Sequence, residues 1–201
     1  MKKSIAALVI ATGLLLTGCS QVNEAASIGD SKIAQTDLQA TVDAILAERA
    51  KVDTAQMQLA SGEDLVRGQL RFKILIQIYD AIAKELDLKV TNAMIAQKRS
   101  EIISQIGGEE KLPESLVSAM IAPDDLDPYL RAIATSDLIT AALIQSGVAE
   151  AEAGARISTL LTAKAAELKI KINPRYGTWD PATGDIIAVD NTDGAVTTPA
   201  K

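Results

Sequence analysis

The chain has 201 residues, of which 48% are hydrophobic, and a formal net charge of −6. An acidic chain gains no affinity from neutralising phosphates, and its aromatic residues (one Trp, three Tyr and one Phe) are few and scattered, so no nucleic-acid partner is expected. The chain has no histidine and a single cysteine, which excludes a Ser-His-Asp triad, an internal disulfide and a zinc site of the usual His/Cys type. No D-x-D-x-D-G loop is present, so neither a metal nor another cofactor is expected.

The N-terminus predicts export. Met1-Lys2-Lys3 is basic, and the apolar run Ile5–Leu16 is shorter than the roughly 20 residues that span a bilayer, as in a secretory signal. Leu16-Thr17-Gly18-Cys19 resembles the lipobox of bacterial lipoproteins, which implies a diacylglyceryl group on the Cys19 thiol. The alternative is an ordinary signal peptide with a chance cysteine. We therefore expect residues 1–18 to be a signal peptide and residues 19–25 a lipidated tether, with the protein on the extracytoplasmic face of the cell membrane.

The first folded segments begin at Ala26. Residues 26–33 predict a short strand and a tight turn at Gly29-Asp30. Thr36 followed by Gln39 matches a capping box, which would start a helix at this point. A long helix is expected over about Ser61–Leu86, with Ser61 at its cap. It is apolar nearly all round, so it is either the buried spine of the domain or a surface that contacts something not always present.

Four further helices are predicted downstream. Thr91 should cap a helix that Gly107-Gly108 stops, and its apolar residues are Met94, Ile95, Ile102, Ile103 and Ile106. A short helix over 112–122, one from about Asp124 to Gly147 and one over 149–168 should follow.

The hydrophobic period then changes from helix to strand. Residues 169–172 alternate polar and apolar, and 186–189 form a second candidate strand, whereas residues 190–201 are small and polar and predict a disordered tail. We expect Ser27–Ile28 to pair with Lys169–Ile172. The predicted fold is therefore mainly α, a bundle of five to six helices with a small β element that joins the two ends of a domain spanning 26–189.

The order of these elements resembles the helical chaperone domain of SurA-like and PrsA-like foldases, which belong with the trigger-factor-type peptide-binding domains. The resemblance covers about Ala26 to Trp179. It is carried by the segments 26–33, 70–76, 85–91 and 125–131, and most specifically by Ile172-Asn173-Pro174-Arg175-Tyr176-Gly177-Thr178-Trp179-Asp180. From the residues alone, Tyr176 and Trp179 should cover the end of the core, and Arg175 should pair with a helix C-terminus or an acid.

The chain also departs from that family. Its foldases carry a parvulin-type prolyl isomerase domain between the long helices and the closing segment. Here 139–147 runs directly into the last helix, and the histidines of a parvulin site are missing. The resemblance thus implies the holding part of a foldase without its catalyst.

Three functions follow as hypotheses. The first is a membrane-anchored holdase that binds unfolded or newly exported polypeptides, with Leu65, Phe72, Ile76 and Tyr79 as candidate contacts. The second is an adaptor lipoprotein that docks one cell-envelope partner through the same surface. The third is an enzyme, which we do not expect, because no motif indicates a Ser-Lys or carboxylate site.

Overall fold

The structure is a computed structural model and describes residues 23–188. Six α-helices and five short strands lie within that part of the chain, which confirms the mainly α fold with a small β element. The helices are α1 (Gln35–Arg49), α2 (Gly62–Glu85), α3 (Asn92–Ile106), α4 (Leu112–Ala119), α5 (Leu126–Gln145) and α6 (Glu150–Glu167). The strands are β1 (Glu24–Ile28), β2 (Ser31–Ala34), β3 (Lys171–Ile172), β4 (Thr178–Asp180) and β5 (Asp185–Ile187). The predicted signal peptide, Cys19 and the tail over 190–201 lie outside the described residues.

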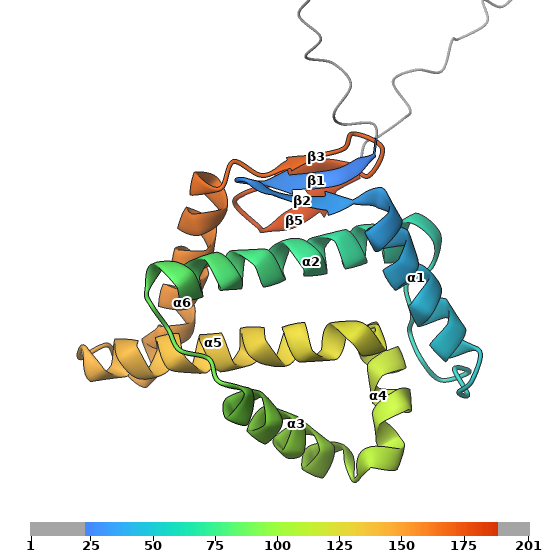
Figure 1. The fold of residues 1–201 in the computed structure, drawn as a ribbon, viewed down its shortest axis with the longest axis horizontal. Helices are drawn as coiled ribbons and strands as arrows, with labels where there is room; N and C mark the ends of the chain where they lie inside the picture. The colour runs from blue at the N-terminus through green and yellow to red at the C-terminus, as the bar shows by residue number, and fades with distance from the viewer. Residues whose placement is uncertain (1–22, 189–201) are drawn as a thin grey trace, which may run out of the picture.

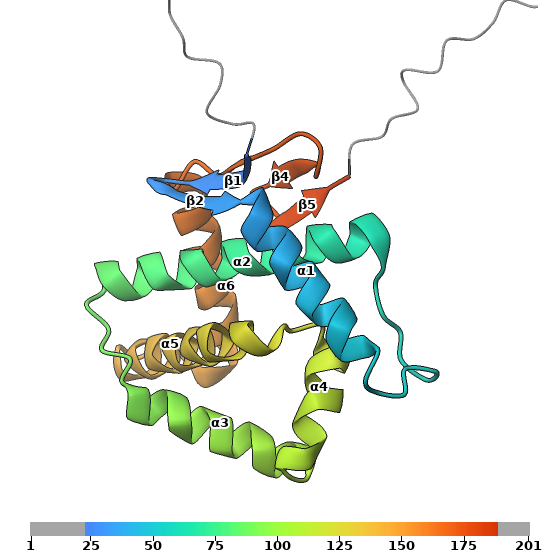
Figure 2. The same cartoon turned by 45° about the vertical axis from the view of Figure 1, so that its right-hand side comes forward.

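The two ends of the described chain meet in a small antiparallel sheet with the order β2-β1-β3. Ala26 pairs with Ile172 and Ser27 with Lys171, so the predicted pairing of the two ends is confirmed. β1 starts at Glu24 and Ala25 is fully buried, so the last two residues predicted as tether belong instead to the sheet. A separate hairpin, β4–β5, lies beside this sheet on the same side of α2 (Figure 2).

Helix α2 is the spine of the domain. Ile74, Ile78 and Ile82 follow at intervals of four, which places them on one face of the helix, and none is more than 1% exposed. The helix packs against α1, α5 and α6 and against strands β1 and β5, so it lies between the sheets and the lower helices (Figure 1). Of the two roles considered for this helix, the structure thus supports the buried spine.

The other helices are arranged around this spine. α5 runs beside α2, and α6 leads from the end of α5 back to the sheets (Figure 1). α3 and α4 lie on the side of α5 away from the sheets, where they form a smaller apolar cluster with it (Figure 2). This cluster consists of Ile95, Leu112, Leu116, Ile121, Leu126 and Leu130. The peripheral helices are therefore held by a second, shallower core.

The helix ends test the predicted caps. The Thr91 hydroxyl accepts a hydrogen bond from the Met94 amide, and Gly107 ends α3 in the left-handed conformation, so both of these predictions are confirmed. The capping box at Thr36 is wrong, because the N-cap of α1 is Ala34, two residues earlier, and the helix begins at Gln35. Thr36 thus lies inside the first turn, where its hydroxyl donates to Asp37. Ser61 precedes α2 as predicted, but its side chain makes no capping hydrogen bond.

The closing segment packs against the main core. Tyr176 and Trp179 are half-buried there, as predicted. Gly177 has φ +128°, and a Cβ at this position would lie 2.3 Å from the carbonyl oxygen of Ile187, so β5 can pass only because this residue is glycine. The prediction for Arg175 is wrong: its guanidinium donates to the side-chain oxygen of Gln35 at the start of α1 and lies over the Tyr176 ring.

Candidate functional site

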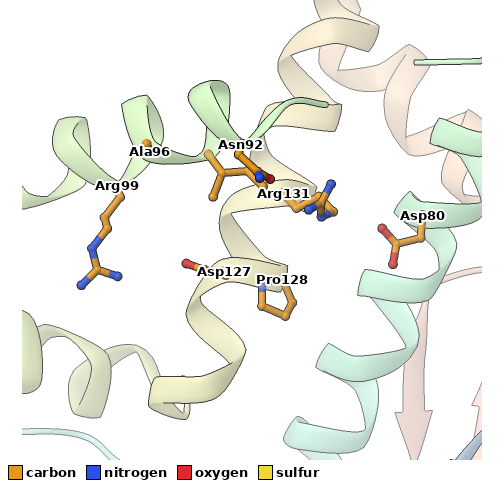
Figure 3. Close-up of a pocket in the computed structure, with 8 residues that line it drawn as sticks. Asp80, Asn92, Ala96, Arg99, Asp127, Pro128 and Arg131 are labelled. Carbon is orange, nitrogen blue, oxygen red and sulfur yellow. The ribbon is translucent and has the colours of Figure 1, made fainter. Parts of the chain in front are cut away.

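The candidate site is a pocket of about 500 Å³ between α2, α3 and α5. It is lined by Asp80 from α2, by Asn92, Ile95, Ala96 and Arg99 from α3, and by Asp127, Pro128 and Arg131 from α5 (Figure 3). The lining residues of α3 follow at i, i+3, i+4 and i+7, which places them on one face of that helix. Helices α2, α3 and α5 thus each form one wall of the pocket.

A second pocket, of about 340 Å³, adjoins the first. Asp80 and Arg131 line both pockets, and the second extends from this pair along the linker between α2 and α3, over Leu88, Lys89, Val90 and Thr91. We call the two pockets together the α2–α3–α5 groove. Such an elongated recess suits an extended ligand better than a compact one.

Opposite charges face each other where the two pockets meet. Figure 3 shows the Arg131 side chain, from α5, reaching toward the side of α2 that carries Asp80. The two residues form no direct ion pair within 4 Å, but Arg131 is near enough to act on the Asp80 carboxyl. Desolvation by the surrounding helices raises the pKa of Asp80, and the positive charge of Arg131 opposes that effect only in part.

Polar contacts line the peripheral wall, which α3 forms. Lys98 on α3 bridges to Asp137 on α5 at 2.8 Å and to Glu101 on its own helix at 2.7 Å. These hydrogen bonds, that to Asp137 first, raise the pKa of Lys98, so the ammonium stays charged through the neutral range. Arg99 is held by Glu109 at 3.0 Å, just beyond the end of α3. Among these contacts, only the Lys98–Asp137 pair joins α3 to α5, and α3 itself buries little apolar surface.

The structure does not bring the four candidate contacts together. Leu65 is 1% exposed and packs with Val42, Ile45 and Ala122, at a different pocket of about 670 Å³ between α1, α2 and Tyr176. The Phe72 ring lies 6.2 Å from that of Tyr129, and Phe72 and Ile76 line a pocket of about 230 Å³.

Tyr79 lines yet another pocket, of about 250 Å³, beside Trp179. None of the four candidate contacts lines the α2–α3–α5 groove. The four are therefore spread over different faces of α2.

Sequence reasoning missed the residues that do line the groove. One signal was present: Asp80 is the only charged residue between Lys73 and Lys84 on an otherwise apolar stretch of α2. A lone carboxylate on a helix buried on several sides indicates either a partner or a cavity. Arg131, Asn92 and Asp127 carried no comparable signal, because solvated helix faces contain the same residue types.

The described residues contain neither a metal-ligand group nor a membrane-spanning helix. No group of three or more His, Cys, Asp or Glu side chains is placed to hold a metal ion among residues 23–188. Within the same range, no helix has the length and apolar character needed to span a bilayer. The groove therefore offers charged, amide and apolar groups, but no assembled set of metal ligands.

Comparison with known proteins gives no relative: no family model, curated protein or solved structure matches this chain. The resemblance to SurA-like and PrsA-like chaperone domains therefore stays a prediction.

Proposed function

We propose that this protein is a lipid-anchored, extracytoplasmic holdase that binds extended segments of unfolded or newly exported polypeptides, without prolyl isomerase activity. The observation that carries the proposal is the α2–α3–α5 groove. It is open to solvent, and it mixes apolar surface with charged and polar side chains rather than presenting a closed cavity.

The chemistry of the groove suits a peptide main chain. The Asp80 carboxylate can accept hydrogen bonds from peptide N–H groups, and the Arg131 guanidinium can donate to carbonyl oxygens. Ile95 and Pro128 in one pocket, and Leu88 and Val90 in the other, offer apolar contacts to side chains of varied shape. Apolar surface interspersed with charged and polar side chains in an open groove can accept segments of varied sequence, which is what a holdase requires.

The predicted anchor supports the same function. β1 begins at Glu24, five residues after Cys19. If Cys19 carries the lipid, five extended residues hold the sheet within about 18 Å of the membrane surface. The groove would then work close to the place where exported chains emerge.

The proposal is tested by suppression of aggregation. The chain from Ser20 onward keeps every described element and should reduce light scattering when a denatured model protein is diluted with it at molar excess. Ala96→Trp should weaken this effect, because Ala96 is exposed and lines the larger pocket, so an indole there would obstruct it. Ala93→Trp is the matched control, since Ala93 is exposed on the same helix but does not line the groove. Failure of the parent chain to suppress aggregation or to bind peptides would refute the proposal.

A further inference from the structure

A third pocket, of about 230 Å³, adjoins the α2–α3–α5 groove, because Pro128 lines both this pocket and the larger pocket of the groove. We call it the Phe72 pocket. It lies where β2, the first turn of α1, helix α2 and the start of α5 meet. Its lining consists of Lys32, Ile33, Asp37, Phe72, Lys73, Ile76, Gln77, Asp125 and Pro128.

The three pockets follow one another along α2 and α5, which lie side by side (Figure 1). From the Phe72 pocket to the smaller pocket of the groove, the lining residues run from Phe72 to Ala83 on α2 and, in the same order, from Asp125 to Thr135 at α5. The distance from Phe72 to Ala83 along the axis of α2 is about 16 Å, which matches about five residues of extended chain.

The lining of the Phe72 pocket favours an uncharged, apolar group. Its charged residues are two lysines and two aspartates, so their formal charges cancel. Lys73 is bound by Asp125 at 3.1 Å, and Lys32 is bound by Glu24. Ile76 is half-buried but belongs to none of the three apolar clusters. The pocket therefore presents an apolar side chain that these clusters do not use, without a net charge that would attract an ion.

Gln77 adds a polar group that lacks a partner. Its side-chain oxygen is shielded from solvent and has no hydrogen-bond donor among the described residues. A shielded acceptor without a donor lowers the stability of the free protein, so such groups call for an explanation. Gln77 lines the pocket and is only partly buried as a residue, so a ligand in the pocket can meet its amide. A peptide N–H is the kind of donor that this oxygen lacks.

We propose that the Phe72 pocket binds one apolar, uncharged side chain of an extended polypeptide segment, and that Gln77 accepts a hydrogen bond from the main chain of that segment. The rest of the segment lies along α2 and α5 in the groove. The inference rests on the proposed function, because it takes the ligand to be a polypeptide. It adds a specific position: an apolar residue at the end of the bound segment that lies next to Phe72.

The test compares two peptides that differ in one side chain. A fluorescent ten-residue peptide of alanine and serine with one central leucine is titrated with the full chain in neutral detergent and followed by anisotropy. The second peptide carries asparagine, which has nearly the same size, in place of the leucine. The leucine peptide should bind about tenfold more tightly, because its side chain leaves water for an apolar pocket.

Ile76→Ala should reduce this preference, because it removes apolar surface from the pocket. Ile103→Ala is the matched control. Ile103 is also half-buried and outside the three apolar clusters, but it lines none of the three pockets, so this variant should keep the preference.

Gln77→Met tests the amide, since methionine has a similar length but offers no amide oxygen. It should weaken the binding of both peptides about three- to tenfold, which is the range expected for the loss of one hydrogen bond. Gln145→Met, at the exposed end of α5, is the control and should bind as the parent chain does. The urea midpoint of Gln77→Met should equal or exceed that of the parent chain, because the variant removes an acceptor without a donor. A lower midpoint would show that the fold itself uses this amide and would overturn its role in binding.

The outcomes separate this inference from the proposed function. If the parent chain binds both peptides equally, or if its preference is unchanged by Ile76→Ala, the inference is overturned and the proposed function stands. Unchanged binding by Gln77→Met would overturn the role of the amide. If the parent chain binds neither peptide, the proposed function fails and the inference fails with it.

Discussion

Helices α2 and α3 are both rich in isoleucine, yet they bury these side chains very differently. In α2, Leu70, Ile74, Ile78 and Ile82 are at most 1% exposed. In α3, five large apolar residues are available and only Ile95 is buried, at 8% exposed. Apolar content alone therefore does not decide burial, because the number of neighbouring elements sets how much of a helix is covered.

The same difference describes the two walls of the groove. α2 is enclosed by α1, α5, α6 and the sheets, whereas α3 packs on α5 and, through a few residues, on α4. Elements with few buried contacts open locally at low cost, and binding surfaces are drawn from such elements. The groove thus combines a rigid wall with an adaptable one, which suits a ligand of variable sequence.

The largest expected effect comes from removing apolar volume from each helix. Ile74 is fully buried, so Ile74→Ala should lower the free energy of unfolding by about 2–5 kcal/mol. Ile103 on α3 is half-buried and belongs to none of the three apolar clusters, so Ile103→Ala should cost less than about 1 kcal/mol. Urea unfolding of both variants measures the difference. Equal losses would mean that α3 is as much a part of the core as α2.

A smaller difference in stability is expected when one glycine of each helix is replaced by alanine. Gly68 lies exposed within α2 and a Cβ there would meet no atom within 4 Å, so Gly68→Ala should stabilise the protein by about 0.5–1 kcal/mol. Gly107 ends α3 at φ +94°, also with open space around it. Gly107→Ala should therefore destabilise by about 1 kcal/mol through backbone strain alone. Thermal unfolding of the two variants shows whether each substitution raises or lowers the stability. Stabilisation by Gly107→Ala would show that the end of α3 rearranges freely.

Local signals made the fold predictable to a large extent. The density of apolar residues over 61–86 predicted the spine, and the hydroxyl of Thr91 and the freedom of Gly107 predicted both ends of α3. The pairing of the chain ends followed from two short alternating segments that had no local partner. The cap at Thr36 failed because strand β2 continues to Ala34 and passes directly into α1, which leaves no turn for a capping residue to close.

The site was less predictable, because it depends on how helices far apart in sequence are oriented. Leu65 and Tyr79 satisfy the same apolar pattern, but α2 turns one toward α1 and the other toward α6 and Trp179. Asp80 and Arg131 are about fifty positions apart and meet only because α2 and α5 run side by side. The spacing of residues within one helix therefore cannot predict that these two side chains lie close together.

The smallest expected effect concerns Asp80, at the border between the two walls. Desolvation raises the pKa of its carboxyl above the ordinary value of 3.8, against the opposing charge of Arg131. The folded state therefore holds this proton more tightly than the unfolded state, and the stability it provides is lost as pH rises from the ordinary value through the folded pKa. Asp80→Asn removes the ionised form, so it should raise the free energy of unfolding at pH 7 by a fraction of 1 kcal/mol, because the carboxylate is only partly desolvated.

Urea unfolding at pH 3, 5 and 7 measures this change, with Asp43→Asn to account for the altered net charge. The gain in stability should shrink as the pH falls and vanish where Asp80 of the parent chain is already neutral. A variant that is less stable than the parent chain at pH 7 would mean that the Asp80 carboxylate stabilises the fold. In that case Asp80 would serve the stability of α2, and α2 would have a structural role on the side that faces the groove as well as in the core. A variant that is more stable would mean that the carboxylate is retained at a cost to folding, as expected of a group that meets its partner only when a ligand is bound.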